Sequence, residues 1–395
     1  MNATSEKDSF QPLGYNDLVE QLYGEYKDSI TSLDKKIASF IVIAKTYNRK
    51  PEKILENLYS GIWTRKQIAF AKLAIRIYEE YERELKKVNA IDFGDMINDA
   101  ISELEHNSKL YYSTYDHILV DEYQDISSQR YQLIKSLMNK NPSCKLFCVG
   151  DDWQGIMSFS GSDLSYIVNF ANYFENPETT VLGRNYRSIK SIVDTGTHLI
   201  KINADSQIKK EIVAANEKIK KVKIYFHLHN EDYKYKYYQE MAQHCIERID
   251  EYLKSGYAPQ DIMILLRILN PKIINNLREY AKQKNIEISE DGMGRGKDVR
   301  LMTIHKSKGL QAKVIFILNV VEDLYGFPCE LDDPTIFMPA KGSNEKREKH
   351  EEERRLFYVA LTRAQEDVYV YTLKCSESKF VKEIKRISDV EDIHY

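Results

Sequence analysis

The chain has 395 residues, of which 43% are hydrophobic and 30% are charged, and it contains 16 glycines and 9 prolines. This composition is typical of globular domains, and the length suits two or three of them, which argues against disorder and fibrous repeats. The 57 Lys and Arg residues against 60 Asp and Glu give a net charge of −3, which excludes a uniformly basic surface and confines any nucleic-acid contact to local sites.

Cysteine usage and hydropathy favour a location away from membranes. The five cysteines form no C-x-x-C pair and no metal-binding spacing, as is typical of a reducing compartment. The first ten residues are polar, and the longest apolar runs, over 37–44 and 314–321, are far shorter than the roughly 20 residues that a membrane-spanning helix needs. We therefore expect a cytoplasmic protein with no membrane partner.

The first part of the chain has the pattern of a helical subdomain. Between residues 68 and 85, apolar side chains recur at spacings near three and four, with Arg and Glu between them. This periodicity is typical of amphipathic helices that bury one face. We assign residues 1–90 to an N-terminal helical subdomain.

From about residue 91 the pattern changes to alternating strands and helices. Short apolar runs fit strands buried in parallel sheets, and the periodic segments between them fit helices. The expected strands are 117–120, 145–149, 222–226, 262–266, 299–304, 314–318 and 368–371. The expected helices lie near 129–138, 188–201, 232–254, 271–283 and 350–361. This alternation predicts an α/β fold with two layers, the first over 91–183 and the second over 184–395.

Two carboxylates follow the first expected strand. Asp121 and Glu122 come directly after His117-Ile-Leu-Val120, at the carboxyl edge where open α/β sheets bind ligands. One carboxylate can hold Mg²⁺ through its hydration shell, and the other can orient or deprotonate an attacking water. An N-cap before the next helix is the alternative interpretation of this pair.

A second block of polar residues follows the next strand. A glycine turn carries Gln154 to the same sheet edge, where its neutral amide could sense a terminal phosphate. Phe159 follows five residues later, and an exposed ring there could stack on a nucleobase, worth roughly 1–3 kcal/mol per base. A position in the core is the alternative for a lone phenylalanine.

Five ordered blocks resemble the motifs of a known family. Asp121-Glu-Tyr-Gln-Asp125, Gly150-Asp-Asp-Trp-Gln154 and Arg184-Asn-Tyr-Arg-Ser188 resemble motifs II, III and IV of the superfamily 1 helicases of the UvrD/Rep type. Segments 299–310 and 352–364 resemble motifs V and VI, and Asp92-Phe-Gly-Asp-Met96 resembles the segment before motif II. The match extends over about residues 60–375, and the Gly-Asp-Asp-Trp-Gln block is similar to the helicase IV branch.

The resemblance implies two RecA-like P-loop-NTPase-type lobes and an ATP site formed by residues of the matched motifs. By motif position, Asp121 would ligate Mg²⁺, Glu122 would activate water and Gln154 would touch the γ-phosphate of ATP. Arg187 and Arg363 would supply positive charge to the transferring phosphoryl group, a task that suits planar and permanently cationic guanidinium groups.

The other matched residues concern the nucleoside and DNA. Tyr186 would stack on adenine, and Gln311 stands where the family commonly has a ribose-contacting Glu, which predicts weaker nucleotide affinity. Phe159 would stack on single-stranded DNA, and His305 would lie near the DNA backbone, with a satisfied polar residue below a strand end as its alternative. The implied function is that of an ATP-dependent 3′-to-5′ DNA helicase or translocase acting on single-stranded DNA or DNA with a 3′ tail.

The sequence departs from the family pattern toward its N-terminus. The sequence contains no P-loop of the form G-x-x-x-x-G-K-[ST]. Its single Gly-Lys pair is Gly296-Lys297, where Asp291 stands in place of the first glycine and Asp298 in place of the final Ser or Thr. The adenine-recognising Gln motif and motif Ia are absent, and the helical segment resembles the 1B insertion that normally follows them. About 110 residues between motifs IV and V leave no room for a large 2B insertion.

We therefore expect an incomplete first lobe. The strands ending at Val120 and Val149 would lose neighbours and expose open edges, and each buried unpaired amide costs on the order of 1–3 kcal/mol. ATP hydrolysis would need a P-loop in trans from a separate polypeptide, and this chain alone would be inactive. The alternative is a truncated, non-catalytic helicase-like module that binds DNA or a protein partner.

Overall fold

The computed structural model describes residues 33–107, 109, 111–228, 234–290, 296–323, 326–329, 334–342 and 349–393. These residues form two compact units. The helical unit contains 33–107, 159–161 and 336–342, and the α/β unit contains the other described residues. The sequence pattern places the end of the helical part at residue 90, whereas the structure also includes 91–107 in it.

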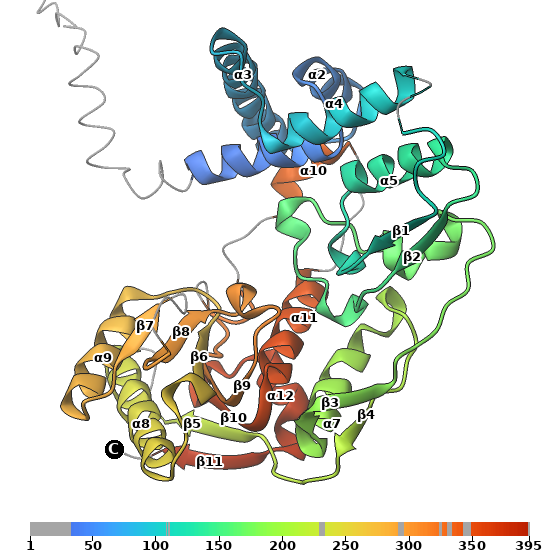
Figure 1. Ribbon diagram of the computed structural model, residues 1–395. Coiled ribbons are helices and arrows are strands. Elements are labelled where there is room, and N and C mark those ends of the chain that lie inside the picture. Colours follow the sequence, from blue (N-terminus) through green and yellow to red (C-terminus); the bar gives the residue numbers. More distant parts are fainter. Residues whose placement is uncertain are drawn as a thin grey trace, which may run out of the picture. The chain divides into compact units, whose positions relative to one another are not determined.

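The helical unit is built from amphipathic helices and one late segment of the chain. Its helices are a helix over residues 33–46, α2 (Pro51–Ser60), α3 (Arg65–Lys87), α4 (Phe93–His106) and α10 (Met338–Lys341). Thr64 and Gln67 form a capping box that begins α3, in which each side chain accepts from the other residue's backbone N–H. Figure 1 shows α10, near the orange-red end of the colour scale, beside the blue α2 and α3.

A buried lysine joins three elements of this unit. The side chain of Lys45 is 3% exposed, and its Nζ lies 2.6 Å from Glu82, 2.8 Å from Asp92 and 2.7 Å from Asp95. Burial alone would lower the pKa of Lys45, but hydrogen bonds to the three carboxylates raise it above its ordinary value. Gly94 lies so close that a Cβ there would come within 3.0 Å of the Lys45 Cβ. This cluster ties α4 to the helical unit.

The α/β unit contains a seven-stranded sheet in which every pairing is parallel. In sheet order its strands are β11 (Asp389–Ile393), β5 (Lys223–His227), β10 (Ala364–Leu373), β9 (Ala312–Leu318), β6 (Ile262–Leu266), β8 (Val299–Thr303) and β7 (Ile288–Glu290). The five strands expected from the sequence in this region are confirmed, although β10 begins four residues earlier than expected. The short polar strands at the two edges, β11 and β7, were not predicted.

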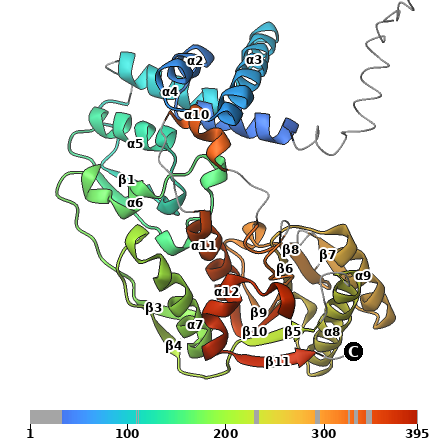
Figure 2. The same ribbon diagram turned by 180° about the vertical axis from the view of Figure 1, so that it is seen from behind.

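Helices cover both faces of this sheet, as Figures 1 and 2 show. One layer contains α8 (Lys234–Lys254) and α9 (Pro271–Gln283), and the other contains α7 (Lys190–Ile200), α11 (Lys349–Thr362) and α12 (Lys379–Ile384). In β6, Met263 and Leu265 belong to the core below α7, α11 and α12, whereas Ile264 belongs to the core below α8 and α9. A strand with helices on both faces must be apolar at every position, which explains its continuous hydrophobic run.

A second, smaller sheet precedes this part of the chain. It pairs β1 (His117–Val120) with β2 (Lys145–Cys148) in parallel, and Leu119 lies opposite Phe147. Ile134 of α5 (Ser128–Lys140) and Tyr166 of α6 (Ser165–Val168) belong to the core on one face of this sheet. On the other face, Leu119 is 73% exposed and Phe147 is 61% exposed. Within the described residues this sheet has two strands, and it leaves apolar side chains uncovered.

A third pair of strands completes the α/β unit. β3 (Arg184–Ile189) pairs in parallel with β4 (Val213–Asn216) and leads directly into α7. The sequence predicts a helix from about residue 188, whereas Ser188 and Ile189 belong to the strand. Across the described segments, no helix is long and apolar enough to cross a membrane.

Candidate nucleotide and DNA site

Asp121 and Glu122 lie in the turn that follows β1, and both side chains are exposed. The N–H of Glu122 donates to Asp121 Oδ1 at 2.8 Å, and Glu122 has a φ of +50°, a left-handed conformation that costs a non-glycine residue on the order of 1 kcal/mol. The N–H of Tyr123 donates to the carbonyl of Val149 at 2.8 Å, which ties the turn to the end of β2. Ser127 caps α5, and Glu122 stands at the N-cap position of the short helix η1 (Tyr123–Asp125) without a capping hydrogen bond from its side chain.

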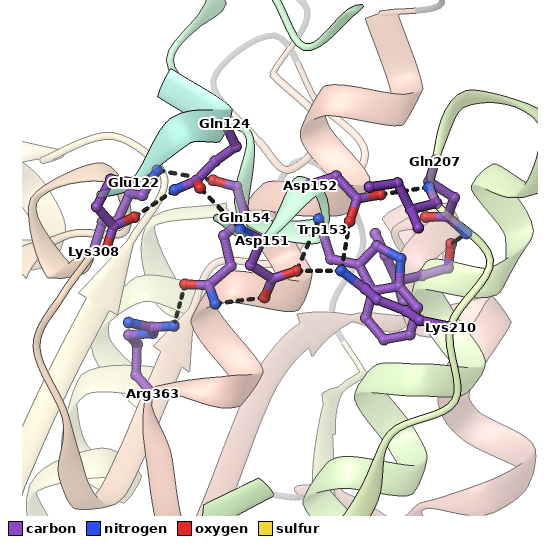
Figure 3. A network of polar contacts seen from close by, with 12 residues as sticks. Glu122, Gln124, Asp151, Asp152, Trp153, Gln154, Gln207, Lys210, Lys308 and Arg363 are labelled. Carbon is purple, nitrogen blue, oxygen red and sulfur yellow. Dashed lines mark hydrogen bonds and ion pairs between the residues drawn. The ribbon is translucent and has the colours of Figure 1, made fainter. Parts of the chain in front are cut away.

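Gln154 lies at the end of the short helix η2 (Asp152–Gln154), which follows β2. Its Nε2 donates to Asp151 Oδ2 at 2.7 Å, and its Oε1 accepts from Arg363 Nη2 at 2.9 Å (Figure 3). Because a carboxylate only accepts hydrogen bonds and a guanidinium only donates them, these two neighbours fix the orientation of the amide. The structure thus brings together two predicted site residues that are 209 positions apart.

Gln124 extends this network to the acidic turn. Its Oε1 accepts from the N–H of Asp151 at 2.9 Å, and its Nε2 donates to Glu122 Oε2. A Cβ at position 150 would come within 2.7 Å of the Gln124 Oε1, so this close approach requires Gly150. The amide of Gln124 therefore links the residues after β1 to those after β2, and the motif II match contained it without assigning it a role.

Lys210 lies at the other end of the network, and sequence reasoning missed it. Its Nζ lies 2.5 Å from an oxygen of Asp151 and 2.5 Å from one of Asp152, and 4.5 Å from the centre of the Trp153 ring (Figure 3). Asp152 is 1% exposed, so its charge needs a buried counterion. Residue 210 lies between the matched motifs IV and V, and no local pattern distinguishes it from other lysines.

Arg363 is almost completely buried just after α11. It is 1% exposed, and besides Gln154 it donates from Nε to the carbonyl of Val359 at 3.1 Å and from Nη1 to that of Leu310 at 3.3 Å. Burial, and then the neighbouring Arg187, lower the pKa of Arg363 to about 10. The guanidinium therefore remains cationic at neutral pH.

Three of the other predicted residues gather around β3. Arg187 is exposed and donates from Nε to Gln311 Oε1 at 3.0 Å and from Nη1 to the carbonyl of Thr362 at 3.4 Å. Tyr186 is 77% exposed, with the Arg184 guanidinium 5.7 Å from its ring centre. The exposed ring of Tyr186 could stack on the base of a nucleotide. The guanidinium of Arg187 could bind its phosphates.

Lys308 connects the matched motif V to motifs II and III. Its Nζ lies 2.6 Å from Asp125 Oδ2 and 3.0 Å from the carbonyl oxygen of Gln154, and its side chain is 9% exposed. Burial raises the pKa of Asp125, while the bond to Lys308 acts in the opposite direction. Lys308 and Asp125 both lie inside matched motifs, so the sequence marks each of them as a candidate. It does not show that the two residues meet.

The two predicted DNA contacts differ in their surroundings. Phe159, in the turn Ser158–Ser160, is 56% exposed, so the core alternative for its ring is wrong. His305 is half-buried and begins the turn His305–Ser307 after β8. Burial, and then the neighbouring Arg267, lower the pKa of His305 to about 4, so its imidazole is neutral at pH 7. It could therefore donate one N–H to a phosphate but would add no charge.

The carboxylates after β1 suit a magnesium ion that is held mainly by its other ligands. No group of three or more His, Cys, Asp or Glu side chains in the described residues could hold a metal ion. Mg²⁺ usually keeps several waters and binds through one or two carboxylates together with substrate phosphates. Asp121 and Glu122 fit that requirement, since both are exposed at the sheet edge.

Comparison with known proteins agrees with the motif order. The UvrD/REP helicase N-terminal domain matches residues 2–175, and the UvrD-like helicase C-terminal domain matches residues 271–374. DNA helicase IV of Escherichia coli is 32% identical over 322 residues, which cover 80% of this chain and 42% of the relative. The ATP-dependent DNA helicase PcrA of Staphylococcus epidermidis is 30% identical over 200 residues, which cover 50% of this chain and 26% of the relative.

These matches identify the family. The parallel α/β architecture and the ordered helicase motifs define a protein of the superfamily 1 helicase class. Within that class, the chain belongs to the UvrD/Rep-type helicase family. The chain spans less than half the length of the helicase IV and PcrA relatives that it matches.

Proposed function

We propose that this chain is part of an ATP-dependent 3′-to-5′ DNA helicase or translocase that acts on single-stranded DNA or DNA with a 3′ tail. Its relatives include enzymes named as DNA helicases and as ATP-dependent DNA helicases. The observation that carries the proposal is the hydrogen bond between Gln154 and Arg363. It joins the residues matched to motifs III and VI, which an ATP site shared by two RecA-like lobes requires to be close together.

The proposed catalytic roles follow the motif positions and the local chemistry. Asp121 holds Mg²⁺, which neutralises charge on the phosphate oxygens when it is bound. Glu122 orients and deprotonates the attacking water, and Gln154 contacts the γ-phosphate. Arg187 and Arg363 stabilise the charge that develops on the transferring phosphoryl group. The buried Arg363 is already directed toward Gln154, so little reorganisation is needed at that point.

The remaining roles concern nucleoside and DNA recognition. Tyr186 stacks on adenine with its exposed ring, and Gln311, held by Arg187, replaces the ribose-contacting Glu of the family pattern. Phe159 stacks on a base of single-stranded DNA, and the neutral His305 donates a hydrogen bond near its backbone. We also propose a cytoplasmic location, since the spacing of the five cysteines is typical of a reducing compartment.

We further propose that the phosphate-cradling loop comes from polypeptide outside these 395 residues. The sequence contains no P-loop pattern, and the β1–β2 sheet leaves Leu119 and Phe147 exposed on one face. Apolar side chains on a sheet face normally pack against another layer. Added strands and helices carrying the P-loop would cover this face and supply the backbone amides that bind phosphates.

ATP turnover, measured with and without single-stranded DNA, tests the proposal. We expect no turnover by this chain alone, and DNA-stimulated turnover when it is mixed with a polypeptide that carries the P-loop and is encoded beside it. Glu122→Gln should abolish the restored activity, because the amide cannot accept the proton from water. The matched control Glu52→Gln, on an exposed position of α2, should leave it unchanged.

Two outcomes would contradict this function. Brisk turnover by the chain alone would show that another segment binds the phosphates. If a mixture of the two folded polypeptides hydrolyses no ATP, and Glu122→Gln leaves every measured activity unchanged, the alternative function is favoured. In that alternative the chain is a non-catalytic, helicase-like module that binds DNA or a protein partner.

A further inference from the structure

The helix α11 and the residue that follows it contact motif III (150–154) at two places and the segment after it at a third. Arg363 bonds to Gln154, as described above. The ring of Tyr358 meets that of Trp153 edge-on, with centres 5.6 Å apart. Near the start of the helix, Glu352 accepts hydrogen bonds from Ser158. Motif III and the segment after it, up to Ser158, therefore lie along α11.

The spacing of these contacts shows the direction in which residues 154–158 run relative to α11. Gln154 and Ser158 are four residues apart, so they can be separated by at most about 14 Å. Glu352 and Arg363 are eleven residues apart, which corresponds to about 16 Å along a helix axis. Because Arg363 and Glu352 reach the segment with long side chains, residues 154–158 lie beside α11 and run in the opposite direction.

Glu352 makes a two-point contact with one residue of this segment. One carboxylate oxygen accepts from the backbone N–H of Ser158 at 3.0 Å, and the other accepts from its hydroxyl. The adjacent glutamates have different partners. Glu353 makes a bidentate contact with Arg267, and Glu351 lies 3.7 Å from Arg355. Of these three neighbouring acids, Glu352 is the one that contacts Ser158, four residues after motif III.

We propose that Glu352 is a positioning residue for nucleic-acid binding. By holding the backbone and the hydroxyl of Ser158, it fixes the start of the turn from which the exposed Phe159 projects. The inference rests on the proposed function, in which the Phe159 ring stacks on a base. It adds that α11 carries a contact to Ser158, which precedes Phe159 in the chain, in addition to the contact of Arg363 with the phosphate-sensing amide.

Electrostatics makes the sign of this effect diagnostic. Removing a carboxylate near a DNA site should by itself strengthen binding, because it removes repulsion of the phosphates. A positioning role for Glu352 predicts the opposite, since loss of its contact with Ser158 lets the start of the turn move, and binding must then order it.

The test measures the affinity of the 395-residue chain for a fluorescein-labelled oligothymidine by fluorescence anisotropy at fixed salt. Phe159→Ala should weaken binding roughly 5- to 150-fold, the range for the loss of one base–aromatic stack. Glu352→Ala should weaken it about 3- to 10-fold, a part of that loss. In the double variant, Glu352→Ala should cause no further loss of affinity beyond that of Phe159→Ala, because Glu352 acts through the Phe159 ring.

Matched variants separate positioning from general damage. Glu351→Ala removes the same charge from the same turn of α11 and should not weaken binding. Glu352→Gln should restore most of the affinity, since its amide can still accept from the Ser158 N–H and pair with the hydroxyl. Amide hydrogen exchange supplies a readout independent of DNA, in which Glu352→Ala should speed exchange at Ser158 and leave β6 unchanged.

Different results would overturn different steps. If Phe159→Ala weakens binding and Glu352→Ala does not, the positioning role is wrong and the proposed DNA contact stands. The positioning role is also wrong if Glu352→Ala costs as much affinity in the Phe159→Ala background as in the original chain. Unchanged binding by Phe159→Ala would overturn the proposed base stacking and, with it, this inference.

Discussion

Arg363 and Arg187 have the same proposed chemistry but very different structural surroundings. The guanidinium of Arg363 donates to three oxygens, those of Val359, Leu310 and Gln154, from an almost completely buried position. Arg187 is exposed. The two residues should therefore differ in what they contribute to stability, even if both serve the phosphoryl group.

Replacing each arginine by lysine separates these contributions. Arg363→Lys leaves at least one buried carbonyl without its donor, and we expect the free energy of unfolding to fall by about 1–3 kcal/mol. Arg187→Lys should lower it by less than about 1 kcal/mol, because water can replace its contacts. Urea unfolding of both variants measures the difference. Equal losses would show that burial does not distinguish the two sites.

His305 predicts a pH dependence of stability. The unfolded chain takes up a proton on this residue near pH 6.5, whereas the folded chain does so only near pH 4. Between these values the unfolded state binds more protons, so the free energy of unfolding falls as the pH is lowered from about 7 to about 4. Burial, and then Arg248, lower the pKa of His244 to about 4 as well, so it contributes in the same direction.

Urea unfolding at several pH values tests this expectation for His305. His305→Gln should flatten part of the decline, by on the order of 1–3 kcal/mol over the window. The remaining slope should persist because His244 is unchanged. His198→Gln, at an exposed position of α7, is the control and should leave the slope as it was. A decline that His305→Gln does not alter would assign the pH dependence to other groups.

At the scale of elements, motif IV shows how tertiary pairing creates a strand. The sequence Arg184-Asn-Tyr-Arg-Ser-Ile189 has no apolar alternation and was expected to lead into a helix. It forms β3 because β4 supplies a partner in parallel register, with Arg184 opposite Val213. The strand leaves both Tyr186 and Arg187 exposed, while Ser188 and Ile189 are buried.

The Lys45 cluster predicts how the helical unit responds to the loss of one charge. Lys45→Met leaves Glu82, Asp92 and Asp95 close together without their common cation, and breaking a buried ion pair typically costs 3–5 kcal/mol. We expect a loss of about that size, with α4 released first. Lys72→Met, at an exposed position of α3, should change stability by less than about 0.5 kcal/mol. Thermal unfolding followed by circular dichroism compares the two, and similar melting of both variants would contradict the structural role of Lys45.

At the scale of the whole molecule, the seven-stranded sheet and the β1–β2 sheet should differ in local stability. β6 is paired on both sides and its residues are at most 1% exposed, whereas among the described residues β1 pairs only with β2 and exposes Leu119. Strands with fewer partners and more exposed surface open more readily.

Amide hydrogen exchange of the purified chain measures this difference. We expect the amides of 118–120 to exchange much faster than those of 262–266. Firm protection of both strands would mean that the β1–β2 sheet is stable without further neighbours. It would also remove a main support for the proposal that additional polypeptide covers this sheet.

The sequence by itself determined the family, the α/β alternation and most of the central strands. These features are written locally, in continuous apolar runs such as 262–266 and in motifs whose residues are adjacent in the chain. It also singled out the proposed site residues Asp121, Glu122, Gln154 and Arg363, because each lies inside a matched block.

Only the tertiary structure decided which of these residues meet and what supports them. It paired Gln154 with Arg363, placed Lys210 against Asp151, joined Glu352 to Ser158 and included residues 336–342 in the helical unit. A lysine or a glutamate has no local pattern that names its partner, since that partner is set by where distant strands and helices bring the chain. For this reason the chemistry could be inferred from short segments, and its supporting contacts could not.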